Sequence, residues 1–90
     1  ARVSLKRRIW VRDSGQCCMC SRVVDLHESE LDHRIALQFG GDNSEQNLWT
    51  LCTECHAGKS AREAAGGQPD EEALKHSIPD EGEAASAQVY

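Results

Sequence analysis

The stretch CTECHAGK, residues 52–59, carries most of the information about the fold of this chain. It contains two cysteines at C-x2-C spacing, and CCMC at residues 17–20 contains a second pair with the same spacing. Two such pairs in one short chain are typical of a site in which four thiolates bind Zn²⁺ tetrahedrally. We therefore predict that the paired cysteines are zinc ligands: Cys17, Cys20, Cys52 and Cys55.

The fifth cysteine, Cys18, lies inside the first pair. Because the C-x2-C spacing pairs Cys17 with Cys20, we expect Cys18 to take no part in the zinc site. Two other interpretations of the cysteines are a reduced protein with small buried thiols and a redox protein that uses C-x-x-C as a dithiol. The first does not explain the paired spacing, and the second does not require two pairs.

The size and composition of the chain also favour a metal staple. The chain has 90 residues, enough for one small domain, and aromatic residues make up 4% of it, so a purely apolar core would be thin. The sequence contains no signal peptide and no transmembrane run, which argues against disulfides and against a membrane partner. We therefore expect a cytoplasmic protein with reduced cysteines.

The net charge of −5 is unevenly distributed along the chain. Residues 1–65 contain nine Lys/Arg and nine Asp/Glu, whereas residues 66–90 contain one lysine and six acidic residues. The N-terminal segment is basic. A basic segment of this kind can contact a phosphate backbone, but the same charges are explained equally well by a helix face exposed to solvent. The residues of this basic patch precede the first acidic residue, Asp13; they are Arg2, Lys6, Arg7, Arg8 and Arg12.

Apolar spacing and turn residues predict a few short elements around the two cysteine pairs. We expect an amphipathic helix over residues 4–13 with Ser4 as its N-cap, and a second helix that begins at a Thr53 cap and ends at Gly66-Gly67. The expected extended segments are residues 23–26, 28–35 and 47–51. Residues 66–90 are acidic and poor in large apolar side chains, so we predict that they are mostly disordered and dispensable, with at most a short helix over 71–76.

Cys55 and His56 are neighbours at the start of the second predicted helix. Their side chains would project about 100° apart, so one can face the zinc while the other faces a second site. Four sulfurs already satisfy tetrahedral zinc, although a His56 that binds the zinc remains an alternative.

The order of these features resembles that of the HNH endonuclease family. The resemblance covers residues 5–63 and rests on CCMC (17–20), LDH (31–33), GGDN (40–43), NLWTLC (47–52) and CHAGK (55–59). It implies an α+β fold, in which residues 1–65 form a zinc-stapled ββα-metal domain with an N-terminal helix, followed by an acidic tail in residues 66–90. The three letters of the family name correspond to His33, Asn47 and His56.

The resemblance also implies an activity, which is metal-dependent hydrolysis of phosphodiester bonds in DNA. In this interpretation Asp32 and His56 hold one divalent cation such as Mg²⁺ or Mn²⁺, and His33 is the general base that deprotonates water. Asn47 supports the reaction by tying the loop backbone and so holding His33, while the zinc is structural. Candidate phosphate contacts are the basic residues Lys59, Arg34, Arg62, Arg7 and Arg8. The resemblance suggests a bacterial or phage-encoded protein, monomeric or dimeric.

A non-catalytic zinc-binding module for nucleic acid or protein is the alternative function. It needs the four cysteines alone, whereas the enzyme also needs Asp32, His33, Asn47 and His56. The sequence contains this second set intact, which favours the enzyme.

Overall fold

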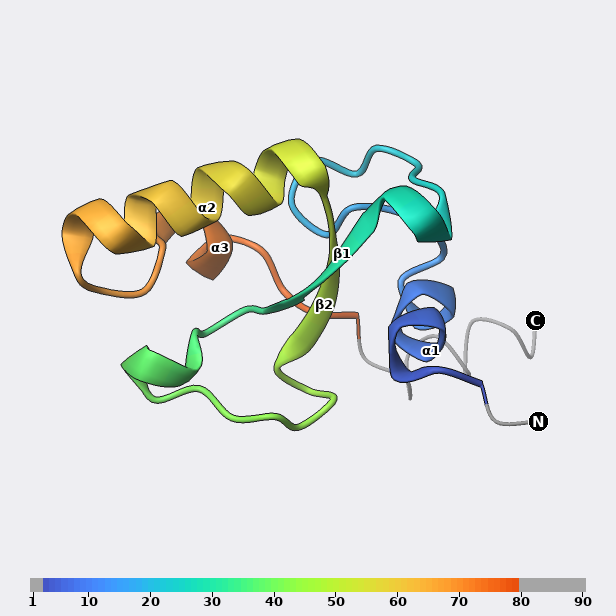
Figure 1. Ribbon diagram of the computed structural model, residues 1–90, viewed down its shortest axis with the longest axis horizontal. Coiled ribbons are helices and arrows are strands. Elements are labelled where there is room, and N and C mark those ends of the chain that lie inside the picture. Colours follow the sequence, from blue (N-terminus) through green and yellow to red (C-terminus); the bar gives the residue numbers. More distant parts are fainter. Residues whose placement is uncertain (1–2, 80–90) are drawn as a thin grey trace.

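The computed structural model describes residues 3–79, and within this range it is a small α+β domain (Figure 1). Its elements are, in chain order, α1 (Leu5–Arg12), β1 (Ser29–His33), β2 (Leu48–Cys52), α2 (Thr53–Gly66) and α3 (Glu71–Leu74), with short 3-10 turns at Leu26–Glu28 and Leu37–Phe39. The consecutive order β1, β2, α2 is the predicted ββα arrangement, and the predicted fold class is therefore confirmed.

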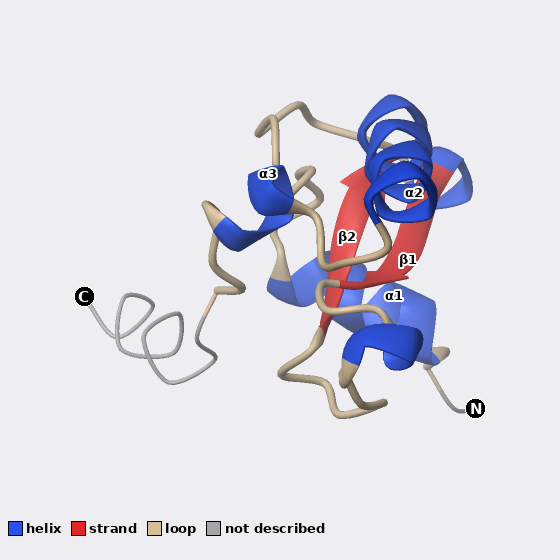
Figure 2. Cartoon of the chain, turned by 90° about the vertical axis from the view of Figure 1, so that its left-hand side faces the viewer, coloured by secondary structure: helices blue, strands red, loops and turns tan. Residues whose placement is uncertain are grey.

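β1 and β2 form a two-stranded antiparallel sheet whose register places Asp32 opposite Trp49 and His33 opposite Leu48. All five residues of β2 are buried. Since successive side chains of a strand point to opposite faces, both faces of β2 must be covered. Helices α1 and α2 provide this cover by contacting both strands, and Figure 2 shows α2 lying across the sheet with α3 beside it.

Both long helices begin at a side-chain cap. The Oγ atom of Ser4 accepts a hydrogen bond from the backbone N–H of Arg7 at 3.1 Å, which confirms the predicted cap of α1. The predicted Thr53 cap of α2 is wrong, because the cap residue is Cys52, whose Sγ accepts from the N–H of Cys55 at 3.4 Å. One predicted zinc ligand thus also starts the helix.

The predicted strand over residues 23–26 is wrong. Val23 makes one isolated bridge, with Gln16, and its side chain is exposed. The N–H of Cys17 donates to the carbonyl of Arg22 at 2.8 Å, so this segment closes the first cysteine turn instead of pairing along a sheet. The sequence suggested a strand because Val23 and Val24 are β-branched, and β-branched residues favour extended backbone whether or not they pair in a sheet.

A buried ion pair between Arg12 and Asp13 connects α1 to β2. The guanidinium of Arg12 donates to both carboxylate oxygens of Asp13 and to the carbonyls of Glu45 and Leu48, and Asp13 accepts from the N–H of Thr50 at 2.8 Å. The side chain of Arg12 is 5% exposed. Arg12 is therefore a structural residue and not part of the predicted basic patch.

Residues 66–79 pack against the domain: α3 lies within the short helix predicted over residues 71–76, and the disorder predicted for the rest of this segment is wrong. Ala73 of α3 is fully buried, Ile78 packs on the core, and Asp70 caps α3 while forming an ion pair with Arg62 of α2. Cutting the chain near residue 66 would remove these contacts. Residues 80–90 of the predicted tail lie outside the described residues. The domain boundary at residue 65 stays a prediction, and the buried contacts of residues 66–79 extend across this boundary.

None of the helices in residues 3–79 combines the length and the apolar character that a membrane crossing needs.

Candidate metal centre and active-site cluster

The four paired cysteines converge at one end of the sheet. Their Sγ atoms all lie within 4.8 Å of one another, and those of Cys20 and Cys52 are 3.9 Å apart. Sulfurs bound to zinc at about 2.3 Å in a tetrahedron lie about 3.8 Å apart, so four thiols in this arrangement fit Zn²⁺. Burial raises the pKa of Cys17, yet N–H groups of Cys20, Cys52 and Met19 outweigh it and lower that pKa to about 7, which favours a thiolate.

Cys18 lies outside this cluster, as predicted. Its N–H donates to the carbonyl of Thr50 at 2.9 Å, which fastens the cysteine turn to β2. Burial, together with the neighbouring carboxylate of Asp13, raises the pKa of the Cys18 thiol to about 12. A protonated, partly buried thiol of this kind is a packing residue.

His56 faces away from the cysteine cluster and toward Asp32. Its Nε2 atom lies 3.7 Å from Oδ1 of Asp32, whereas the preceding residue, Cys55, joins the sulfur cluster. The two neighbours therefore diverge around the helix as their spacing predicts. This placement disfavours His56 as a zinc ligand.

The carboxylate of Asp32 is held in a fixed orientation at the end of β1. Its Oδ2 atom accepts from Nε1 of Trp49 and from Nζ of Lys59, both at 2.9 Å, which leaves Oδ1 directed at His56. Two atoms that each bind one cation at about 2.1 Å lie at most about 4.2 Å apart. The oxygen–nitrogen pair of Asp32 and His56 therefore fits a shared divalent cation in both distance and donor type.

His33 is the last residue of β1 and follows the buried Asp32 directly, with a partly exposed side chain. Its Nε2 lies 2.8 Å from Oδ1 of Asn43. Since the amide oxygen of Asn43 accepts hydrogen bonds, this contact fits the neutral tautomer that carries its hydrogen on Nε2 and has a free lone pair on Nδ1. The neutral ring is thereby left with one nitrogen able to take a proton.

Asn43 was not among the site residues predicted from the sequence. We expected Asn47 to hold His33, but the residue whose side chain accepts a hydrogen bond from the imidazole is Asn43. The signal was present in GGDN, because this Asn lies ten residues after His33 in the loop that follows β1, and the loop turns back and brings it within reach of the imidazole.

Asn47 closes the loop that carries Asn43. Its Nδ2 donates to the carbonyls of Ile35 and Asp42 at 2.9 and 2.8 Å, and its Oδ1 accepts from the N–H of Ile35 at 3.0 Å. This three-bond clamp joins the two ends of the loop between β1 and β2. Asn47 thus acts on the loop backbone, as its chemistry suggested, and reaches His33 indirectly.

Comparison with known proteins agrees with this geometry. The family model described as HNH endonuclease matches residues 17–62, which is more than half of the chain. The chain belongs to the HNH endonuclease family. Membership gives this HNH domain a nuclease-type function in general terms, and the matched segment includes the four cysteines together with His33, Asn47 and His56.

One solved structure shares the fold of this HNH domain. The Type II-C Cas9 enzyme from Actinomyces naeslundii superimposes with a TM-score of 0.55 at 20% sequence identity. The alignment covers 83% of this chain and 9% of that enzyme, so the chain corresponds to a small part of its length. None of the curated proteins compared with the chain matches it.

Three of the predicted phosphate contacts of the HNH domain are engaged within the protein. Lys59 is 1% exposed and its ammonium is surrounded by protein acceptors, a placement that does not fit a phosphate contact. Arg62 forms a two-bond pair with Asp70. Arg34 donates to the backbone carbonyls of Leu74 and His76 and lies over the ring of Trp49.

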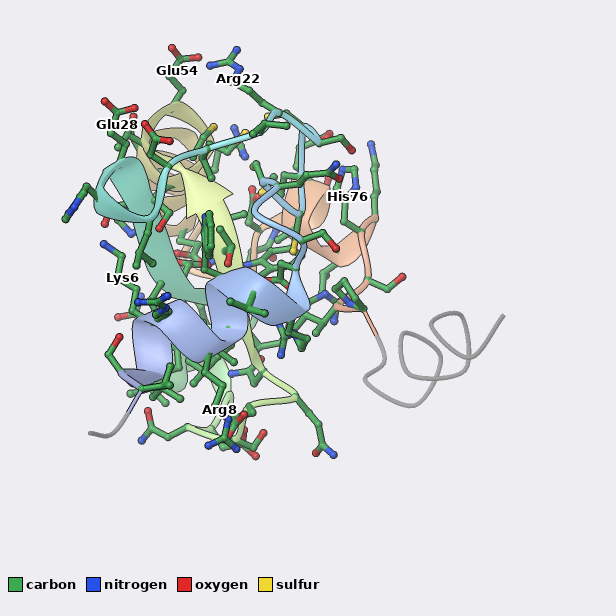
Figure 3. All side chains as sticks on the ribbon, turned by 90° about the vertical axis from the view of Figure 1, so that its right-hand side faces the viewer. Lys6, Arg8, Arg22, Glu28, Glu54 and His76 are labelled. Carbon is green, nitrogen blue, oxygen red and sulfur yellow. The ribbon has the colours of Figure 1, made fainter. Side chains whose placement is uncertain are left out.

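The two remaining candidates, Arg7 and Arg8, are exposed on α1. Arg8 reaches Glu45 at 2.8 Å with a side chain that is 61% exposed, and such an exposed ion pair contributes little stability. Figure 3 shows Lys6 and Arg8 projecting from this helix, and it also shows Arg22 and Glu54 directed at each other on another part of the surface. A phosphate contact by α1 is compatible with this exposure.

Replacing Gly41 with alanine is expected to disrupt the loop of the HNH domain. A Cβ atom at this position would lie 1.8 Å from the carbonyl oxygen of Ile35 and 2.8 Å from Nδ2 of Asn47, so the Asn47 clamp must open. We expect Gly41→Ala to lower the free energy of unfolding by about 3 kcal/mol, as urea denaturation would measure.

Gly66→Ala is the matched control for this substitution. The nearest atom to a Cβ at Gly66 is in the Gln68 side chain, 3.6 Å away, and the residue ends a helix. We expect a change of less than about 1 kcal/mol for it. Equal urea midpoints for the two variants would contradict the close packing assigned to Gly41.

Proposed function

We propose that this HNH domain is a metal-dependent endonuclease that hydrolyses phosphodiester bonds in DNA. The observation that carries the proposal is the pair formed by Oδ1 of Asp32 and Nε2 of His56, which is separate from the cysteine cluster and lies one residue from His33. A structural zinc module needs none of these three residues. The non-catalytic alternative therefore leaves the Asp32–His56 pair without a purpose.

His33 supplies the base in this proposal. Its Nδ1 takes a proton from a water molecule whose oxygen bonds to phosphorus as the bond from phosphorus to the 3′ oxygen breaks, and the leaving 3′ oxygen takes a proton from solvent. The hydrogen bond between Nε2 and Asn43 keeps the ring in the tautomer and orientation that this transfer requires.

Asp32 and His56 would hold one divalent cation, Mg²⁺ or Mn²⁺, between a carboxylate oxygen and an imidazole nitrogen. When bound, such a cation supplies electrostatic stabilisation of the phosphate and of the leaving oxygen. The four cysteines would hold a structural Zn²⁺, which fixes the first turn of α2. Since His56 follows Cys55 directly, the cysteine cluster determines where the imidazole lies.

DNA is the proposed substrate and α1 is the proposed contact with its backbone. Arg7 and Arg8 are exposed there, whereas Arg34 and Arg62 would first have to leave their partners in residues 66–79. Phosphate contacts of this kind position the duplex without reading its sequence.

Metal titration of two variants tests the proposed cation ligands. We expect Asp32→Ala and His56→Ala each to raise the Mn²⁺ concentration needed for half-maximal plasmid cleavage by at least about tenfold, with partial recovery at high Mn²⁺. Zinc content should stay unchanged, because sulfur fills that site. His27→Ala, on an exposed histidine, is the control and should behave as wild type. Loss of zinc from His56→Ala would show that the assignment of two separate metals is wrong.

A further inference from the structure

A buried cluster of three charged residues, Lys59, Glu63 and Asp32, includes one of the two proposed cation ligands. The ammonium of Lys59 is 2.8 Å from Oε2 of Glu63, 2.9 Å from Oδ2 of Asp32 and 2.8 Å from the carbonyl oxygen of His33. Lys59 is 1% exposed and Glu63 is 8% exposed. Burial of charged side chains costs desolvation free energy even when they are paired. The burial of Lys59 and Glu63 beside the proposed cation site therefore calls for a reason.

Lys59 fixes the two residues at the end of β1 to helix α2. All three hydrogens of its ammonium have acceptors, one on the Asp32 carboxylate, one on the His33 backbone and one on Glu63. Together with Nε1 of Trp49, it occupies Oδ2 of Asp32 and leaves Oδ1 for His56. The proposed base and the proposed metal ligand are therefore positioned by one side chain.

The negative charge of Glu63 balances the positive charge of Lys59 beside the proposed cation site. An ammonium against Asp32 offsets the negative charge that attracts a divalent cation, so Asp32 and Lys59 alone would form a neutral pair. Glu63 lies one helical turn after Lys59, and its carboxylate accepts a hydrogen bond from the Lys59 ammonium. The three charged groups together carry a net charge of −1.

We propose that Lys59 and Glu63 are positioning residues that set the affinity of the cation site through the net charge that they give it. This inference rests on the proposed function, in which Asp32 and His56 hold the cation. It adds that Glu63, which does not touch the site, determines how strongly the site attracts a divalent cation by balancing Lys59.

Direct binding of Mn²⁺ tests the inference without measuring cleavage. Free Mn²⁺ is quantified by electron paramagnetic resonance in the presence of the full-length, zinc-loaded protein without DNA. Three variants shift the cluster charge in different directions: Glu63→Gln makes it neutral, Lys59→Met makes it −2, and the double variant restores −1. Cleavage by each variant is recorded separately.

The expected affinities follow the charge. Glu63→Gln should weaken Mn²⁺ binding about fourfold or more, as Coulomb's law gives for a unit charge and a divalent cation less than about 10 Å apart in water. Lys59→Met should tighten binding, and the double variant should bind more tightly than Glu63→Gln alone. If the two residues had only a structural role, Lys59→Met would bind Mn²⁺ more weakly than wild type, and the double variant would bind it more weakly than Glu63→Gln, because each of these changes removes a further buried contact. If Lys59→Met fails to retain zinc, the two variants with Glu63→Gln decide between these outcomes.

Two control variants separate this inference from the proposed function. Glu54→Gln removes an acid of α2 whose side chain is 75% exposed, and screening should keep its effect below about twofold. Asp32→Ala should abolish most Mn²⁺ binding. If Asp32→Ala weakens binding while Glu63→Gln does not, the charge-setting role is overturned and the proposed site stands. If Asp32→Ala binds as wild type, both are overturned.

Discussion

Replacing His33 with alanine is expected to remove most DNA cleavage while the protein still binds DNA, zinc and the divalent cation. The imidazole is the group proposed to take the proton of the attacking water, and it contacts Asn43 instead of the Asp32–His56 pair. Loss of a general base typically costs about 10²- to 10⁴-fold in rate. Single-turnover cleavage of a short duplex, compared with Mn²⁺ binding by the same variant, separates the chemical step from binding.

Asn43→Ala is the companion to this substitution. It keeps the base but removes the hydrogen bond that orients it, so we expect a smaller loss of about tenfold, typical of a residue that supports another. A wild-type rate for His33→Ala would contradict the mechanism. Equal losses of rate and of Mn²⁺ affinity would instead make His33 a metal ligand.

Removing the zinc, or replacing Cys52 with serine, is expected to unfold the domain. Apparent binding free energies of structural zinc are about 10–16 kcal/mol, comparable with or larger than the 5–15 kcal/mol stability of a whole domain. Cys52 has two further roles, because it is 4% exposed at the end of β2 and its Sγ caps α2. We therefore expect the loss of cooperative thermal unfolding, with zinc content followed by native mass spectrometry.

Cys18→Ser is the matched control for the zinc prediction. Cys18 lies in the same turn but outside the cluster, and its contact with Thr50 is made by the backbone. This variant should retain one zinc and lose little stability. If Cys52→Ser kept its zinc and its melting temperature, the four-cysteine site would be wrong.

The parts of the fold that the sequence predicted are those with a short linear signature. C-x2-C spacing is recognisable in the sequence because one tight turn can supply two of the four ligands of a tetrahedral zinc, and this spacing predicted the cysteine cluster. The short apolar run at residues 47–51 was predicted as a strand, and the structure has β2 one residue later, with all five residues buried and both α1 and α2 in contact with it. The strand expected at residues 23–26 failed because pairing requires a partner segment, which local propensity does not specify.

The parts that the sequence did not predict are buried charges. Basic residues such as Arg12 and Lys59 are usually exposed to solvent or bind phosphate. In this protein the charged group of each is instead surrounded by hydrogen-bond acceptors from segments distant in sequence. Whether a cation faces water or a carboxylate depends on the tertiary packing around it, and a single sequence does not contain that information. The same holds for Asp70, whose pairing with Arg62 brings residues 66–79 against the domain although their composition suggests disorder.

Cleavage of supercoiled plasmid by the purified, zinc-loaded protein is the measurement that tests the central claim most directly. The plasmid is incubated with Mg²⁺ or Mn²⁺, with parallel samples lacking divalent cation, containing EDTA, or containing His33→Ala. We predict conversion to relaxed or linear DNA by the wild-type protein with added cation, and little conversion in the three parallel samples. A wild-type protein that carries one zinc and leaves the plasmid supercoiled with both cations would contradict the proposed endonuclease activity.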